Sequence, residues 1–262
     1  MRKCLFVITT LLIGVCLFGA DVAYAVKLEV DADASRWAHI GAGVLLYLHI
    51  GGGAIGLVAG STASLVRKGG VVHRAAGKVF LGSMFIAYVI GAGVAPFLSE
   101  GQRPNFVAGI LALYLLITGV LAAKRRNFQA SRAEYVGLVI ALTITALGVL
   151  FAVMGANSES GTVDGSPPQA FYLFVIAGLA AAGGELNVII KRSLSEVARK
   201  SRHLWRMCVS FFFASGSLFL GQPQVFPDWF NESIFPIFLA FIPILVMMIW
   251  LVKVRMGHNT RT

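Results

Sequence analysis

The chain has 262 residues, of which 57% are hydrophobic and 13% charged, and its mean hydropathy is +0.80. A water-soluble domain of this size covers its core with far more charge, so the composition excludes that class and indicates a membrane protein. The formal net charge of +10 would suit a nucleic-acid-binding protein, but basic residues in membrane proteins usually mark cytoplasmic loops.

The beginning of the chain has the features of a secretory signal. Two basic residues are followed by an apolar run, and Ala-Tyr-Ala at positions 23–25 fits a cleavage site between small residues. We therefore expect a signal peptide over residues 1–25 and a short periplasmic segment over residues 26–36. The alternative is an uncleaved first transmembrane helix.

Seven further apolar segments follow, and most approach the ~20 residues that a helix needs to cross a bilayer. They are residues 37–60, 78–98, 106–123, 135–156, 170–190, 207–222 and 234–252. The sequence therefore predicts an all-α fold, an integral membrane bundle of about seven transmembrane helices. This domain would cover residues 37–252 and be followed by a cytoplasmic tail over residues 253–262.

The basic residues lie mostly on one side of this map. Of the 22 Lys and Arg residues, 17 lie in or beside the first, third and fifth loops between spans and in the tail. The positive-inside rule then places the mature N-terminus outside and the C-terminus in the cytoplasm of a bacterial inner membrane. The loop over residues 157–169, NSESGTVDGSPPQ, agrees because it is polar, flexible and acidic, as an outer loop can be. Topology thus accounts for the positive charge, and we expect no nucleic-acid partner.

His49 lies about midway through the first predicted span. Gly52, Gly56 and Gly60 form a GxxxGxxxG run, and helical spacing puts His49 near this small-residue face. We therefore expect His49 to point into the bundle rather than at lipid. Its role could be that of a hydrogen-bonded structural histidine or of a group that binds a proton or substrate.

Glu185 lies about one and a half turns from the cytoplasmic end of the fifth predicted span. An ionised carboxylate at the centre of a bilayer costs ~2.5–3.5 kcal/mol on insertion scales. Glu185 must therefore be paired, protonated or able to reach water. Its candidate partners are Arg74, Arg202 and Arg206, and a structural salt bridge is the alternative to a functional carboxylate.

Two stretches combine histidine with arginine at the predicted cytoplasmic starts of spans. The first is KGGVVHRAAGKVF (68–80), which contains His73 and Arg74, and the second is RKSRHLWRMCVSFFFASGSLFLGQPQVFP (199–227). Their arginines and lysines could simply anchor lipid head groups, but histidine is a poor anchor because it is mostly neutral at pH 7. We expect these residues to meet Glu185 in a polar cluster at the cytoplasmic mouth of the bundle. Such a cluster would suit an anionic head group, a haem propionate or a small anion.

Together with LHIGGGAIGLVAG (48–60), these stretches resemble a bacterial family of multi-pass membrane proteins, domain of unknown function 2306. The resemblance extends from about His49 to Pro227. It implies that the family's recurring positions here are His49, His73, Arg74, Gly77, Arg202, His203, Trp205, Arg206 and Gln222. It also implies that Glu185 replaces an acidic residue, commonly Asp, in the fifth span. The family brings no settled activity, so it implies a fold rather than a function.

Several function classes stay open. In a cofactor-binding or redox-associated protein, His73 and His203 would ligate haem b, or a metal ion together with Glu185. In a small-solute or proton-coupled transporter, His49 and Glu185 would carry the proton or substrate. An assembly protein without a ligand is the third class. The motifs of soluble enzymes (GxSxG, Walker A, Rossmann and HExxH) are absent, which favours a non-enzyme.

The first class is the preferred interpretation: an inner-membrane protein that binds a cofactor or anion. The predicted binding residues are His49, His73, Arg74, Glu185, Arg202, His203, Arg206 and Gln222. Expected partners are the lipid bilayer, a small ligand or cofactor, and either a second copy of the chain or a membrane-complex partner.

Overall fold

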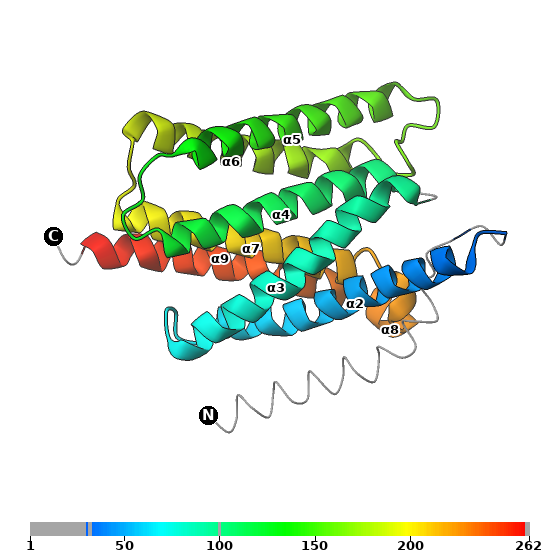
Figure 1. Cartoon of the computed structure of the whole chain (residues 1–262), viewed down its shortest axis with the longest axis horizontal. Coiled ribbons are helices and arrows are strands. Elements are labelled where there is room, and N and C mark those ends of the chain that lie inside the picture. The colour runs from blue at the N-terminus through cyan, green and yellow to red at the C-terminus, as the bar shows by residue number, and fades with distance from the viewer. Residues whose placement is uncertain (1–29, 31–32, 99–100, 260–262) are drawn as a thin grey trace. The chain divides into compact units, whose positions relative to one another are not determined.

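The protein is described by a computed structural model over residues 30, 33–98 and 101–259, so the predicted signal peptide lies outside the described residues. Helices dominate this part of the chain (Figure 1). Its β-structure is limited to two isolated bridges, Gln129 with Ser193 and Val163 with Ser166. The predicted all-α fold is therefore confirmed.

The helices are numbered from α2, as in Figure 1. The long helices are α2 (Arg36–Leu65), α3 (Val71–Val94), α4 (Gln102–Lys124), α5 (Arg132–Asn157), α6 (Gln169–Lys191), α7 (Glu196–Phe219) and α9 (Phe235–Asn259). The short ones are α8 (Asp228–Asn231) and the 3₁₀ turns Ala95–Phe97 and Pro223–Val225.

Six helices of the described residues, namely α2, α3, α4, α5, α6 and α9, are long and apolar enough to cross a membrane. The chain is thus a multi-pass membrane protein that contacts the bilayer. The predicted span 207–222 overlaps α7, which begins earlier, at Glu196, and ends earlier, at Phe219. The first three turns of α7 are charged, and its apolar remainder over residues 207–219 measures about 20 Å at 1.5 Å per residue. The bilayer core is ~30 Å thick, so α7 can cross it only if protein shelters its arginines.

The described helices group into two compact units. The first unit contains the described residues up to Ile90 together with Phe211–Ile244, and therefore α2, most of α3, the end of α7, α8 and the start of α9. The second unit contains the described residues between Gly91 and Ser210 and those from Leu245 onward, and therefore α4, α5, α6, most of α7 and the end of α9. The candidate site lies within the second unit.

In the first unit, α2 and α3 form a hairpin that packs through the predicted small-residue face. A β-carbon on Gly52 would lie 2.9 Å from the carbonyl oxygen of Ser83 on α3, so only glycine allows this approach. His49 lies on the same face and pairs through Nδ1 with the carbonyl oxygen of Ala87, 2.9 Å away. His49 therefore points toward α3, as expected from the sequence.

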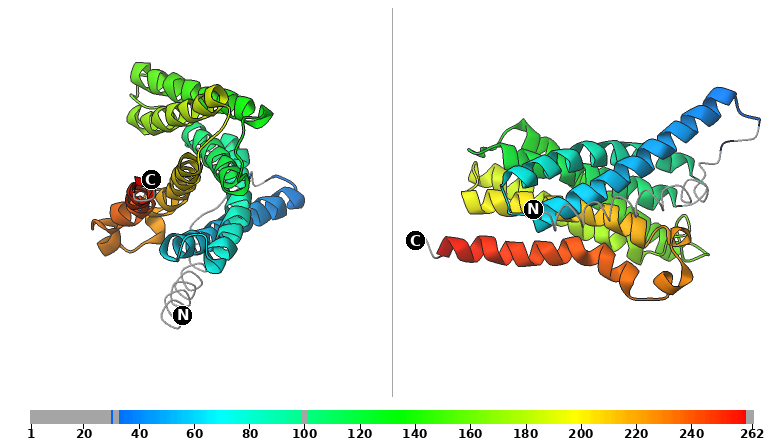
Figure 2. Two further views of the ribbon diagram at one scale, coloured as in Figure 1. Left: turned by 90° about the vertical axis from the view of Figure 1, so that its left-hand side faces the viewer. Right: turned by 90° about the horizontal axis from the view of Figure 1, so that it is seen from below.

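The connection between α7 and α9 in the first unit, drawn in orange in Figure 2, includes the short helix α8. Phe219, Phe226 and Phe230 stack in sequence, with ring centroids 5.7 and 4.6 Å apart. In α9, Pro243 cannot donate a backbone hydrogen bond to the preceding turn. Ser215 Oγ of α7 donates to the carbonyl of Ala240 in that turn at 2.9 Å, which joins α7 to α9 beside the proline.

In the second unit, α5 and α6 lie side by side (Figures 1 and 2). Small residues permit the contact: a β-carbon on Gly148 would lie 2.9 Å from a methyl group of Val175. The start of α5 is a capping box, in which the hydroxyl of Ser131 and the side chain of Glu134 satisfy backbone N–H groups of the first turn. This cap fixes Glu134 near the end of α4, where it becomes part of the site.

The loop between α5 and α6 is tied to the start of α4. Asp164 has a φ of 49° and accepts hydrogen bonds from the backbone N–H of Arg103 at 2.9 Å and from Arg103 Nη1 at 2.5 Å. Its own carbonyl accepts from the N–H of Gly101 at 3.1 Å. The sequence predicted a flexible loop here, whereas these contacts hold its centre in one position.

Candidate functional site

The centre of the second unit is the carboxylate of Glu185, whose side chain is 1% exposed. Oε2 accepts from Arg202 Nη2 at 2.5 Å, and Oε1 accepts from Arg206 Nη1 at 2.9 Å. The hydroxyl of Tyr114 donates to Oε1 at 2.7 Å. Glu185, Arg202, Arg206 and Tyr114 are called the buried cluster below.

Four helices build this cluster. Arg202 and Arg206 are four residues apart on α7, so they lie on one face, one turn apart. Glu185 comes from α6 and Tyr114 from α4. α5 contributes Gly137, which faces the carboxylate and leaves room for it because it has no side chain. The predicted pairing of Glu185 with Arg202 and Arg206 is confirmed.

A second ion pair lies beside the cluster. Arg125 Nη1 donates to Glu134 Oε1 at 2.6 Å, and Ser131 donates to Oε2. Two guanidinium groups lie near the ring of Phe128. The Cζ atoms of Arg125 and Arg202 are 4.3 and 5.4 Å from its centroid. Cation–π attraction thus links the Arg125–Glu134 pair to the buried cluster.

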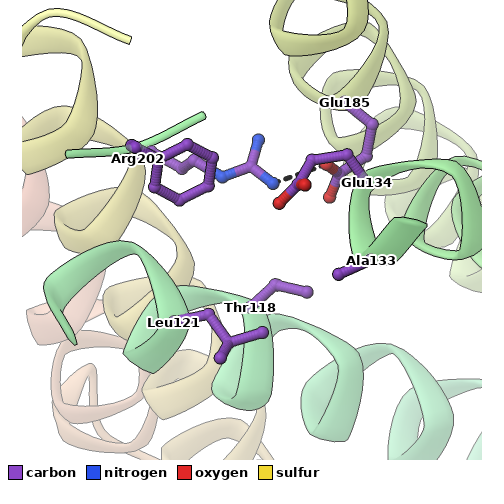
Figure 3. A pocket seen from close by; sticks show the side chains of 7 residues that line it. Thr118, Leu121, Ala133, Glu134, Glu185 and Arg202 are labelled. Carbon is purple, nitrogen blue, oxygen red and sulfur yellow. Dashed lines mark hydrogen bonds and ion pairs between the residues drawn. The ribbon is translucent and has the colours of Figure 1, made fainter. Parts of the chain in front are cut away.

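Glu134, Glu185 and Arg202 also line one small cavity, with Thr118, Leu121, Phe128 and Ala133 completing its wall (Figure 3). Figure 3 shows both carboxylates turned toward the Arg202 guanidinium. The cavity has room for roughly one water molecule. A larger ligand must therefore approach the arginines from another side.

The charges of the buried cluster do not cancel. Two guanidinium groups share one carboxylate, which leaves one excess positive charge. Arg206 has no exposed surface, and its Nε and Nη2 find no acceptor among the described residues. The rings of Tyr114 and Trp205 lie 5.4 and 5.3 Å from its Cζ and stabilise the cation. Buried charge normally requires both a counter-ion and hydrogen-bond partners, so the cluster can accommodate a further acceptor.

The two arginines converge on the position of a missing side chain. A β-carbon on Gly184 would lie 3.6 Å from Arg202 Nη1 and 3.6 Å from Arg206 Nη2, with no other neighbouring side chain within 4 Å. Arg202 Nη1 also donates to the Gly184 carbonyl at 3.2 Å. Gly184 is only partly buried and has no side chain, so at this position it leaves Arg206 Nη2 without a side chain above it.

His203 is on the same turn of α7 but points toward α4. Its Nδ1 pairs with the carbonyl of Gly119 at 2.8 Å, and Arg199 Nη1 donates to the carbonyls of Ala122 and Ala123 at 3.1 and 3.3 Å. The two Arg199 bonds satisfy carbonyls in the last turn of α4, where a helix has no partners of its own. They dock α7 against α4 and so hold the arginines of the cluster in place.

The remaining predicted site residues belong to the first unit. His49 pairs with Ala87 as described, and His73 Nδ1 pairs with the carbonyl of Ala63 at 3.0 Å. Arg74 Nη1 donates to the Gly69 carbonyl at 2.7 Å, and Gln222 Oε1 accepts from Gln224 Nε2 at 2.6 Å. The structure thus brings together three of the eight predicted residues, Glu185, Arg202 and Arg206.

Sequence reasoning missed Tyr114, Glu134 and Gly137. Tyr114 stands alone in an apolar span, and a buried tyrosine hydroxyl usually requires a partner, which was a usable signal. The Ser-x-x-Glu pattern over 131–134 predicts a capping box, but not the ion pair with Arg125. Nothing in the sequence indicated that Gly137 faces Glu185.

A metal centre gains no support from the structure. Within residues 30, 33–98 and 101–259, no three His, Cys, Asp or Glu side chains are grouped so that they could hold a metal ion.

Comparisons with protein-family models, curated proteins and solved structures gave no match to this chain. The function must therefore be inferred from the geometry of the buried cluster.

Proposed function

We propose that this chain is a bacterial inner-membrane protein, with its N-terminus outside and its C-terminus in the cytoplasm, that binds an anionic group at the buried cluster. Membership of the domain of unknown function 2306 family is part of the proposal. The anionic group would be held by Arg206 and Arg202, and Glu185 would keep the two guanidinium groups oriented.

The observation that carries this proposal is the state of Arg206. It is fully buried, it shares its only carboxylate with Arg202, and two of its nitrogens have no acceptor in the described part of the chain. A charge-assisted hydrogen bond to such a group contributes ~1.5–3 kcal/mol. A purely structural ion pair would be expected to use one arginine per carboxylate, or to satisfy both arginines.

Binding of a phosphodiester tests the proposal. The purified protein in a neutral detergent is offered a soluble probe, dimethyl phosphate, and a lipid probe, phosphatidylglycerol, and binding is measured by calorimetry and native mass spectrometry. At least one probe should bind. Arg206→Gln should weaken that binding by about tenfold or more, as the loss of one charge-assisted hydrogen bond predicts.

Arg126→Gln is the matched control, because it removes an exposed positive charge from the same unit. If Arg206→Gln does not fold, Arg206→Lys keeps the charge and removes only the planar donor fork. The proposal fails if neither probe binds, or if Arg126→Gln weakens binding as much as the Arg206 variants do.

Haem b is the second candidate, and one observation favours it. His73 and His203 each pair through Nδ1 with a backbone carbonyl, a bond that metal-ligating histidines commonly make through their second ring nitrogen. The two histidines belong to different compact units. A visible spectrum of the purified protein tests it: a Soret band should be present and should be lost in both His73→Ala and His203→Ala. The transporter alternative would use His49 and Glu185, which belong to different compact units.

A further inference from the structure

Between Leu173 and Ile190, the exposed residues of α6 are apolar apart from Asn187. Ile176, Leu179, Leu186 and Ile190 are between 47% and 69% exposed. Gly183 lies in the middle of this face, and a β-carbon there would have no heavy atom within 4 Å. In a membrane-spanning helix, such a face is suited to contact with lipid acyl chains.

Gly184 lies at the edge of this face and next to the arginines. It is partly buried, and the position of its missing side chain is 3.6 Å from the outer nitrogens of Arg202 and Arg206. A molecule that lies along α6 can thus place a polar oxygen at these nitrogens while its apolar part stays on the lipid-facing side.

The depth of the site is compatible with a lipid head group. Gly184 precedes the last residue of α6, Lys191, by seven residues, which corresponds to about 10 Å. Arginine at this depth draws head groups and water into the bilayer, because local thinning costs less than isolating the charge. The excess charge of the cluster is one, and it is matched by a head group with one negative charge.

We infer that the ligand is a membrane lipid with a singly charged phosphodiester head group, which reaches Arg206 laterally over Gly184 on α6. This inference rests on the proposed function and adds the source of the anion and its route of access. The same phosphodiester chemistry is available in solution, so the experiment must separate the lipid from the free anion.

A pair of neighbouring substitutions provides the test. Gly184→Ala places a methyl group between the two guanidinium groups at ordinary van der Waals distance, so the fold should tolerate it. Gly183→Ala adds the same methyl group one residue away in open space. Binding of phosphatidylglycerol, phosphatidylcholine and dimethyl phosphate is measured for both variants and the unchanged protein by native mass spectrometry.

A second measurement locates the bound lipid. Trp205 is in contact with the Arg206 guanidinium, so its fluorescence should change when the ligand binds. The measurement uses a chain that retains Trp205 alone, with Trp37, Trp229 and Trp250 replaced by Phe. The shift should occur in the Gly183→Ala form of this chain and be absent in its Gly184→Ala form.

The expected result is that phosphatidylglycerol binds at least tenfold more tightly than dimethyl phosphate or phosphatidylcholine. Gly184→Ala should reduce this binding at least fivefold, and Gly183→Ala should leave it unchanged. If dimethyl phosphate binds as tightly as the lipid, or if Gly184→Ala and Gly183→Ala behave alike, the lipid inference is overturned while the anion site stands. If no probe binds, the proposed function itself fails.

Discussion

Gly137 and Glu185 are so close that a β-carbon on Gly137 would lie 2.9 Å from Oε1 and 3.0 Å from Cδ of the carboxylate. Helix α5 therefore receives the carboxyl group of α6 in a position that any side chain would fill. Gly137 therefore packs against the carboxyl group, while the arginines of α7 hold its two oxygens.

Gly137→Ala should consequently displace the carboxylate and weaken both ion pairs. Overpacking of this kind typically costs about 1–3 kcal/mol. Gly183→Ala is the control, because its β-carbon meets nothing and alanine is favoured over glycine in a helix by roughly 0.5–1 kcal/mol. Denaturant unfolding in detergent should show Gly137→Ala as the less stable variant. Equal stability of the two variants would contradict the described contact.

Glu185→Gln should destabilise the protein strongly. It keeps the shape of the side chain but leaves Arg202 and Arg206 without their counter-ion, and breaking a buried pair in this way costs about 3–5 kcal/mol. Lys78→Gln removes a charge from an exposed position of α3 and should change the stability by no more than about 0.5 kcal/mol. Unfolding of both variants in the same detergent checks the difference. A Glu185→Gln variant as stable as Lys78→Gln would exclude a buried, charged cluster.

Asp164→Ala should release the loop between α5 and α6. The variant loses the two hydrogen bonds from Arg103, and alanine is less tolerant than aspartate of the positive φ at this position. A loss of about 1–2 kcal/mol in local stability corresponds to roughly 5–30-fold faster cleavage in limited proteolysis. Glu159→Ala removes an exposed charge from the same loop and should leave the cleavage rate unchanged. Equal rates for both variants would show that Asp164 does not hold the loop.

The distribution of basic residues predicts the orientation of the chain. A reporter that is active only in the cytoplasm should be active when fused at Thr262 and silent when inserted near Ser160. The opposite pattern would overturn the span map. Activity at both positions would indicate that the loop over residues 157–169 does not cross the membrane.

The spans could be predicted because continuous apolar runs determine which segments enter a bilayer. The beginning of α7 could not be predicted in this way. Hydropathy treats Arg202 and Arg206 as charges that belong in water, whereas the structure buries both against Glu185. Helix α7 therefore starts at Glu196, eleven residues before the predicted span. A pairing between distant residues is invisible to any window of consecutive positions.

One part of the site could be predicted, namely the pairing of a buried charged residue with a partner of opposite charge. Glu185 in an apolar helix requires a cation, and the candidates on α7 proved correct. Tyr114 and Gly137 could not be assigned in the same way. Their position depends on how α4 and α5 are rotated about their axes, and spacing within one helix does not determine the rotation of another.

The two histidines of the α2–α3 hairpin have a mechanical consequence. Helix faces made of glycine and alanine have few side chains that interlock, so helices packed through them can slide along one another at little cost. His49 bonds to Ala87 and His73 bonds to Ala63, one from each helix to the other, near opposite ends of the contact. Because a carbonyl oxygen only accepts, both rings must carry their proton on Nδ1. A slip of one residue would break both bonds at once, so the two imidazoles set the register of the hairpin and hold each ring in a single tautomer.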